Sequence, residues 1–129
     1  MNKVKTIKDF TDLKAWQEGH NLVILIYKKT SDFPKREMYS LSDQMRRAAI
    51  SITSNIAEGF GRQSYKEKVQ FYYQAQGSLI ELKNQLIIAR DVFYLSIEDY
   101  EILRSQSNLA HQLLQGLIQK SKTFIIHKS

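Results

Sequence analysis

Apolar residues recur every three or four positions over most of this chain, and that spacing predicts helices. The longest such run alternates steps of three and four without a miss and comprises Tyr72, Ala75, Leu79, Leu82, Leu86, Ala89 and Phe93. Side chains at this spacing share one face of a helix, so we expect a helix of about 30 residues here. The only proline is Pro34, which leaves long stretches free of residues that break helices.

Start and stop signals divide the chain into four helical segments. The first is expected to begin near Asp12, as its N-cap, and to end near residue 30, and the second to run from about residue 40 to Gly59 or Gly61. An S-x-x-E capping box at Ser64–Glu67 opens the third segment, and a serine followed three positions later by an acid opens the fourth at Ser96. The connections are short, which favours antiparallel neighbours.

Each of the other three segments also carries an apolar face that we expect to point into a common core. These faces comprise Leu13, Trp16, His20, Val23 and Tyr27 in the first segment, Leu41, Met45, Ala49, Ile52 and Ile56 in the second, and Tyr100, Leu103, Ser107, Ala110, Leu114, Leu117 and Ser121 in the fourth. The pattern predicts an all-α fold, an antiparallel up-down-up-down four-helix bundle. We expect the bundle to form a single domain over residues 1–129, with flexible ends at about 1–9 and 123–129.

Composition excludes several classes of protein. The chain has no cysteine, which rules out disulfides, thiol catalysis and cysteine-ligated zinc. No apolar run approaches the roughly 18 residues of a membrane span, and the amino terminus lacks the apolar segment of a secretory signal. We therefore expect a cytoplasmic protein with no membrane partner.

The net charge of +6 is unevenly distributed. Residues 1–68 carry 13 Lys and Arg against 8 Asp and Glu, whereas residues 69–129 carry 6 against 5. A basic surface attracts nucleic acid, but it also serves simply as a solvated face that keeps a protein soluble. The charge balance leaves both interpretations open.

Motifs that would indicate catalysis or a metal are missing from the sequence. There is no H-E-x-x-H, Walker, G-x-S-x-G or dinucleotide-binding pattern. The Glu-x-x-His pairs of di-iron bundles are also missing, because Gln17 precedes His20 by three positions and Asn108 precedes His111. We expect no enzyme activity, no cofactor and no metal site, and we interpret His20 as a partly buried structural residue.

Two helical segments are more apolar than an isolated bundle requires. Residues 22–27 are apolar all the way round the first helix, and the third helix has a second apolar stripe that includes Gly77. Surplus stripes indicate contact with another chain, although a wide core within one chain is the alternative. The residues predicted to form an interface between copies are Leu22, Ile24, Leu25, Tyr73, Gly77 and Ile80.

The stretch SNIAEGFGR, residues 54–62, places Glu58 at a helix end where the macrodipole favours a cation. Hydrogen bonds from the start of the next helix, or pairing with Arg62, would offset this penalty. We therefore predict that Asn55, Glu58 and Gly59 lock the corner between the second and third helices. Replacing Glu58 by Gln is then expected to lower the melting temperature.

Four motifs together resemble one known family. They are FTDLKAWQ at residues 10–17, RRAAISI at 46–52, SNIAEGFGR at 54–62 and QGSLIEL at 76–82. The chain is similar to the four-helix-bundle proteins encoded in intervening sequences of bacterial 23S ribosomal RNA genes. This resemblance implies a barrel-like homopentamer. A related accessory protein of diversity-generating retroelements associates with a reverse transcriptase and nucleic acid, which suggests RNA or DNA binding by analogy.

Two functions remain open. The first is a nucleic-acid-binding oligomer, in which a basic rim at the corner between the second and third helices contacts phosphates; its residues would be Arg46, Arg47, Arg62, Lys66 and Lys68. Phe60 and Tyr65 would then stack on bases, or else simply pack. The second is a scaffold whose basic surface docks an acidic protein, such as a nucleic-acid enzyme.

Overall fold

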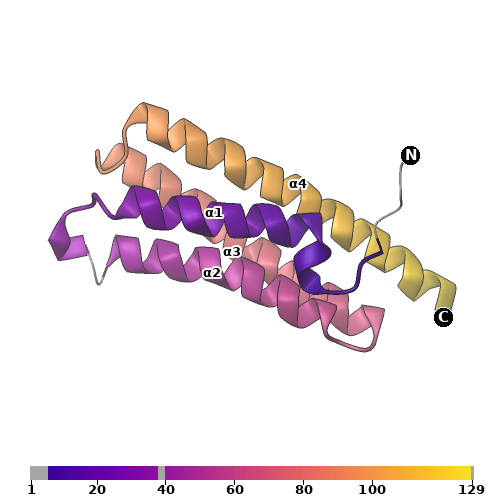
Figure 1. Cartoon of the computed structure of the whole chain (residues 1–129). Helices are drawn as coiled ribbons and strands as arrows, with labels where there is room; N and C mark the ends of the chain where they lie inside the picture. The colour runs from indigo at the N-terminus through magenta and orange to yellow at the C-terminus, as the bar shows by residue number, and fades with distance from the viewer. Residues whose placement is uncertain (1–5, 38–39, 129) are drawn as a thin grey trace.

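Four helices dominate the computed structural model, which describes residues 6–37 and 40–128. They are α1 (Lys14–Thr30), α2 (Leu41–Phe60), α3 (Tyr65–Asp91) and α4 (Ile97–Lys128), and the described residues include no strand. Short 3₁₀ helices, η1 (Phe10–Asp12) and η2 (Lys35–Glu37), precede α1 and α2. The four long helices lie side by side, and α4 extends past the others at the C-terminus (Figure 1). The predicted all-α four-helix bundle is confirmed.

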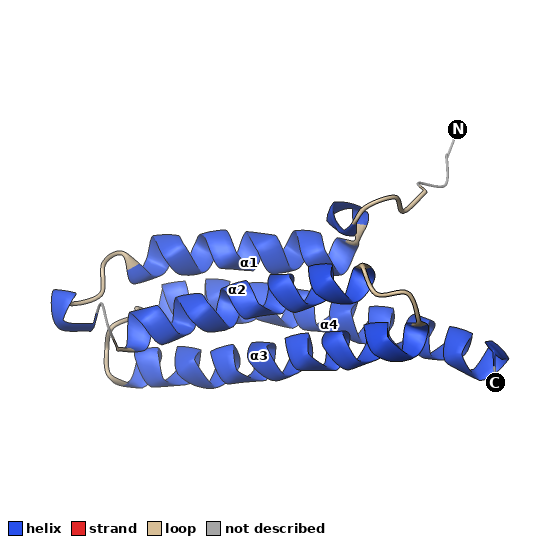
Figure 2. Ribbon diagram, turned by 90° about the horizontal axis from the view of Figure 1, so that it is seen from below, coloured by secondary structure: helices blue, strands red, loops and turns tan. Residues whose placement is uncertain are grey.

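The order of the helices around the bundle decides which surfaces can meet a partner. Contacts join α1 to α2, α2 to α3, α3 to α4 and α4 back to α1. Helices α1 and α3 are therefore diagonal to one another, and their outward faces look in opposite directions. Figure 2 shows the same bundle from below, with the short α2–α3 connection and the C-terminal turns of α4 at one end.

The core is built from the faces that the spacing predicted in α2, α3 and α4. In α3, for example, Tyr72, Leu79, Leu82 and Leu86 are almost completely buried. Leu41 and Leu117 lie at the edge of the core and are half-buried, while Ile118 is buried beside Leu117. The three-and-four spacing identified these faces. In α3, which also carries a second apolar stripe, the buried stripe is the one that follows the spacing without a miss from Tyr72 to Ala89.

The predicted core face of α1 is only partly right, because Leu13, Trp16 and Val23 are half-buried against the core but do not form its centre. The buried residues of α1 are Ala15, Gly19, Leu22, Ile26 and Thr30, whereas His20 and Tyr27 are exposed. A side chain at Gly19 would place its Cβ only 3.2 Å from Cγ2 of Thr53, so the absence of a side chain lets α1 approach α2 closely. Because α1 is apolar all round near its middle, the spacing could not distinguish this face from its neighbour.

His20 is therefore not the partly buried structural histidine that the sequence predicted. Its ring stacks on Trp16 with centroids 4.8 Å apart and 10° between the planes, on the outside of α1. Trp16 in turn contacts Phe10 of η1 edge-on at 5.3 Å. These rings attach the N-terminal segment to α1.

The helix ends differ from the prediction in three places. Phe93 lies outside α3, is 90% exposed and has a φ of 66°, so it terminates the helix in a left-handed conformation. Asp12 caps η1 together with Asp9, while Leu13 is the N-cap of α1 and contributes no side-chain bond. Helix α4 continues to Lys128, through most of the predicted flexible end at 123–129; residues 1–5 of the other predicted flexible end are outside the described part of the chain.

Two predicted caps are present. The Ser64 hydroxyl accepts a hydrogen bond from the Glu67 amide at 3.2 Å, and the Ser96 hydroxyl accepts one from the Asp99 amide at 3.0 Å.

None of the helices in the described part of the chain is apolar over a stretch long enough to cross a bilayer.

Candidate functional site

The corner between α2 and α3 depends on Gly59. A Cβ added at this position would lie 2.8 Å from Cε1 of Tyr72 and 2.9 Å from Cβ of Phe71. Real Cβ atoms do not approach other atoms this closely, so only glycine permits the observed distance between the end of α2 and the first turns of α3. The predicted structural role of Gly59 agrees with this geometry.

Lys68 caps the C-terminal end of α2 from across the turn. Its Nζ donates a hydrogen bond to the carbonyl of Phe60, and it lies 5.2 Å from the centre of the Phe60 ring and 5.7 Å from that of Tyr65. A cation at this position satisfies a free carbonyl and complements the negative end of the helix dipole. Partial burial lowers the pKa of Lys68.

Asn55 and Glu58 contribute less to the corner than the sequence predicted. The amide nitrogen of Asn55 donates to the carbonyl and hydroxyl oxygens of Ser51, one turn earlier in α2, and the Ser51 hydroxyl bonds that of Ser78 in α3 at 2.8 Å. Glu58 lies 3.8 Å from Arg62, and both side chains are exposed. Such a pair contributes about 0–1 kcal/mol, so Gly59 and Lys68 hold the corner rather than Asn55 and Glu58.

The five predicted nucleic-acid-binding residues do not share one rim. Arg62, Lys66 and Lys68 lie at the corner, but Arg46 and Arg47 lie near the start of α2, about 20 Å away at 1.5 Å per residue. The Nε of Arg46 donates to the Thr30 hydroxyl at 2.9 Å, and that of Arg47 pairs with an acid of its own helix at 2.9 Å. Arg46 and Arg47 therefore do not belong to the corner.

Helix α4 brings two further lysines to the corner; the sequence shows them as a basic cluster near the C-terminus but does not place them there. Lys122 donates to the hydroxyl of Tyr73 at 3.2 Å, and the ring of Phe124 stacks on Tyr65 at 4.7 Å. Lys120 lies on the same turns of α4. No local motif could reveal this arrangement, because these lysines are more than fifty residues from the corner in sequence. We call the resulting set the corner surface; it comprises Arg62, Lys66, Lys68, Lys120 and Lys122.

Positive charge on the corner surface is largely uncompensated. Its five cations accompany Glu58 and Glu67 at the corner, and Asp12 lines an adjacent hollow together with Lys120. Among the described residues, the 3.8 Å contact between Arg62 and Glu58 is the ion pair at this end. Four shorter pairs, of 2.8–2.9 Å, lie at the opposite end of the bundle; they are Lys29–Asp99, Arg47–Asp43, Arg90–Asp91 and Arg104–Glu101.

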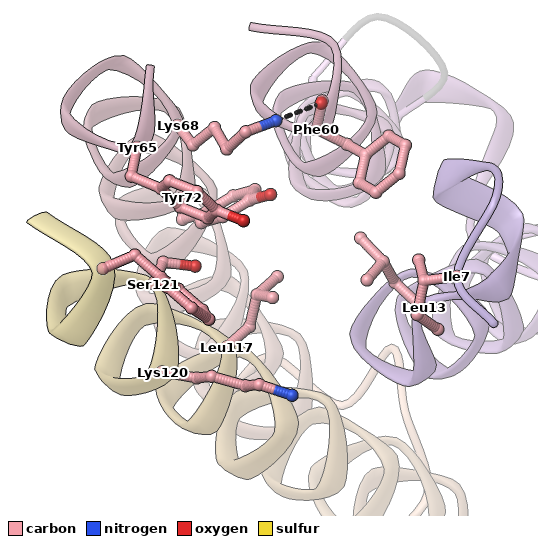
Figure 3. Close-up of a pocket in the computed structure, with 10 residues that line it drawn as sticks. Ile7, Leu13, Phe60, Tyr65, Lys68, Tyr72, Leu117, Lys120 and Ser121 are labelled. Carbon is pink, nitrogen blue, oxygen red and sulfur yellow. Dashed lines mark hydrogen bonds between the residues drawn. The ribbon is translucent and has the colours of Figure 1, made fainter. Parts of the chain in front are cut away.

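A pocket of about 360 Å³ opens at the corner surface (Figure 3). Lys68 and Lys120 line it from different helices, and the hydroxyl ends of Tyr65 and Tyr72 point into it. Burial raises the pKa of Tyr72 to about 12, so its hydroxyl stays protonated at neutral pH. The full lining comprises Ile7, Leu13, Phe60, Tyr65, Lys68, Tyr72, Leu117, Lys120, Ser121 and Phe124.

The predicted interface residues divide into buried and exposed ones. Leu22 has no exposed surface and belongs to the core of its own chain, which corrects its assignment, and Leu25 is half-buried against that core. Ile24, Tyr73 and Ile80 are 43–52% exposed. Gly77 is exposed as well, and an added Cβ would meet nothing within 4 Å.

The side chains present at the site offer several groups that can bind a ligand. Within the described residues, no three or more histidines and acids are grouped so that they could hold a metal ion. The corner surface offers cations, aromatic rings and hydroxyl groups. These groups suit recognition of an anion that carries planar rings.

A family model described as 23S rRNA-intervening sequence protein matches residues 11–116. The chain belongs to this family. The resemblance found in the four sequence motifs is thereby confirmed, while the relation to the retroelement accessory protein stays a prediction. The match includes Arg62, Lys66 and Lys68 of this intervening-sequence protein but ends before Lys120 and Lys122 of α4.

One solved structure with the same fold is a protein of unknown function from the S23 ribosomal protein family of Bacteroides thetaiotaomicron. It aligns with a TM-score of 0.72 at 22% sequence identity and covers 81% of the intervening-sequence protein and 97% of the Bacteroides chain. At this identity the likeness shows the fold alone. A comparison with curated proteins gives no match.

Proposed function

We propose that this intervening-sequence protein is a non-enzymatic, nucleic-acid-binding protein that acts as a homo-oligomer. The observation that carries the proposal is the corner surface, where the α2–α3 turn, α3 and α4 bring together five cations with three nearby acids, Asp12, Glu58 and Glu67. The other end of the bundle carries basic residues too, but many of them are paired with acids at 2.8–2.9 Å. Uncompensated charge concentrated at one end is what a polyanion requires.

The cations of the corner surface are held over aromatic rings. Arg62 lies 4.5 Å from the centre of the Phe71 ring, and Lys122 lies 5.8 Å from that of Tyr73. These contacts restrict the side chains before a ligand arrives, which reduces the entropy lost on binding. Binding would be directed mainly at phosphates, with little discrimination between bases.

Oligomer formation is supported by the apolar residues left exposed on two helices. Ile24 lies on α1, and Tyr73, Ile80 and Ile87 lie on α3. Because α1 and α3 are diagonal, these two stripes cannot meet in an isologous contact. The α1 stripe of one copy would contact the α3 stripe of the next, and such a heterologous contact closes into a ring when the rotation permits. Five copies per ring is the number that the family resemblance implies.

A ring would strengthen nucleic-acid binding without any additional contact in the monomer. Each copy would present one corner surface, so one nucleic acid would engage several weak sites at once. Gly77 lies within the α3 stripe, and its missing side chain would let a neighbouring backbone approach closely.

Filter binding of 23S ribosomal RNA fragments at increasing salt tests the proposal. Five phosphate contacts per copy predict a slope of about −4 in a plot of log affinity against log salt concentration. Absence of any affinity at about 50 mM salt would contradict nucleic-acid binding. That outcome would favour the alternative, a scaffold whose basic surface docks an acidic protein.

A further inference from the structure

The pocket at the corner surface has a wall of aromatic rings. Tyr65 at the start of α3 and Phe124 near the end of α4 stack at 4.7 Å with 27° between their planes. Phe124 remains 38% exposed, so part of this stacked pair is open to a ligand. Aromatic rings at the edge of a basic surface form a platform on which any of the nucleobases can stack.

The volume of the pocket limits what enters it. At about 360 Å³ it lies near the lower end of the range of about 300–1,000 Å³ that is typical of small-molecule sites. A single nucleobase with its sugar is of this scale, whereas a double helix is not. Bases within a duplex are stacked inside it and reach a pocket only after they are flipped out, at a cost in free energy.

The charges of the pocket are placed for the phosphates that flank such a base. Lys68 and Lys120 contribute to its lining from α3 and α4, and Lys120 is exposed (Figure 3). Lys68 uses one of its three N–H groups on the Phe60 carbonyl, which leaves two for other acceptors. Arg62 lies over the Phe71 ring and Lys122 on Tyr73, so these cations belong to the corner surface but do not line the pocket.

We infer that this pocket receives one unstacked base of a single-stranded nucleic acid, while Lys68 and Lys120 contact the adjoining phosphates. The inference rests on the proposed nucleic-acid binding and adds the class of ligand, which is single-stranded rather than duplex. The Tyr65–Phe124 pair supplies the stacking surface. The hydroxyl groups of Tyr72 and Ser121 lie in the lining, where they meet the polar edge of the base.

The test measures the affinity of the full-length protein for a fluorescein-labelled RNA of about 12 nucleotides, first single-stranded and then annealed to its complement. We expect the single strand to bind more tightly than the duplex. Phe124→Ala should weaken binding of the single strand by about tenfold and leave duplex binding unchanged, because one stacked base is lost. Phe124→Trp should restore the affinity, since the indole ring also stacks.

A matched control comes from the opposite end of the bundle. Phe93 is 90% exposed and lies outside the corner surface, so Phe93→Ala should leave both affinities unchanged. Equal affinity for single strand and duplex, with no effect of Phe124→Ala, would overturn the inference about the pocket. If the binding still depended steeply on salt, the proposed nucleic-acid binding would stand. Absence of binding to either RNA would overturn both. Binding of an acidic peptide at the pocket in preference to the single strand would also overturn the inference.

Discussion

The Nζ of Lys83 lies 2.7 Å from the Nδ1 of His111, across the contact between α3 and α4. Both side chains are half-buried. Burial lowers the pKa of His111, and the positive charge of Lys83 lowers it further; burial also lowers the pKa of Lys83. An imidazole must be neutral to accept a hydrogen bond from an ammonium group, so the pair requires unprotonated His111.

The first prediction concerns stability at mildly acidic pH. The pKa of His111 is lower in the folded protein than its ordinary value of 6.5. As the pH falls through 6.5, the unfolded chain therefore binds a proton at His111 before the folded chain does. The free energy of unfolding should therefore decrease between about pH 7.5 and pH 5.5. Urea unfolding across this range measures the decrease.

The variant His111→Gln should reduce this pH dependence, since Gln accepts a hydrogen bond from Lys83 and does not titrate. His20→Gln is the matched control, because His20 is exposed on α1 and the variant should keep the wild-type slope. Identical slopes for wild type and His111→Gln would show that another group is responsible.

The second prediction concerns the α2–α3 corner. Gly59→Ala should lower the free energy of unfolding by about 1–3 kcal/mol, because its Cβ would overlap Tyr72 and Phe71. Gly116→Ala, on the outside of α4 with nothing within 4 Å of the added Cβ, should raise it by about 0.5–1 kcal/mol. Thermal and urea unfolding compare the two variants.

Glu58→Gln provides a second comparison at the same corner. The exposed 3.8 Å contact with Arg62 predicts a change within about 0.5 kcal/mol, smaller than the sequence suggested. If Glu58→Gln lowered the free energy of unfolding as much as Gly59→Ala, Glu58 would have the structural role at the corner that the sequence predicted.

The third prediction distinguishes a heterologous ring from other assemblies. Ile24→Glu on α1 and Ile80→Glu on α3 should each convert the oligomer to smaller species, measured by light scattering at micromolar concentration, because a charge would be buried in the contact. Mixed one to one, the two variants should form a complex of two chains. In each mixed pair, the unaltered α3 stripe of Ile24→Glu contacts the unaltered α1 stripe of Ile80→Glu.

An isologous contact predicts a different result. An α1–α1 contact would be lost only in Ile24→Glu and an α3–α3 contact only in Ile80→Glu, and mixing the two variants would form no mixed pair. A wild-type protein that is monomeric at micromolar concentration would remove the ring altogether.

The fourth prediction assigns nucleic-acid binding to the corner surface. Replacing Lys66, Lys120 and Lys122 together by Gln should weaken RNA binding and reduce the steepness of the salt dependence by about 2–3, or 0.7–0.9 per phosphate contact. The control variant also removes three positive charges, but at the other end of the bundle, by replacing Lys28, Lys35 and Arg36 with Gln. Equal losses in both triple variants would indicate attraction by net charge alone.

Local patterns predicted most of the bundle for a definite reason. In α2 one stripe is clearly more apolar than the others, and in α3 and α4 a long series of three-and-four steps marks the buried stripe. In α1 the residues around Leu22 are apolar on all sides, and the face that is buried was chosen by the fit of Gly19 against Thr53 of α2. That fit involves residues 34 positions apart, which periodicity does not detect.

The candidate site divides in the same way. The caps at Ser64 and Ser96 are short-range features, because a capping hydrogen bond involves neighbouring residues, and the order of amino acids sufficed to locate them. The sequence also marked Gly59 as the end of α2, but its close contact with Tyr72 depends on how α2 and α3 pack. The contact of Lys68 with Phe60, the stacking of Phe124 on Tyr65 and the arrival of Lys122 beside Tyr73 depended on how the helices pack. Packing joins side chains that are distant along the chain, so folding in three dimensions was needed to create the corner surface.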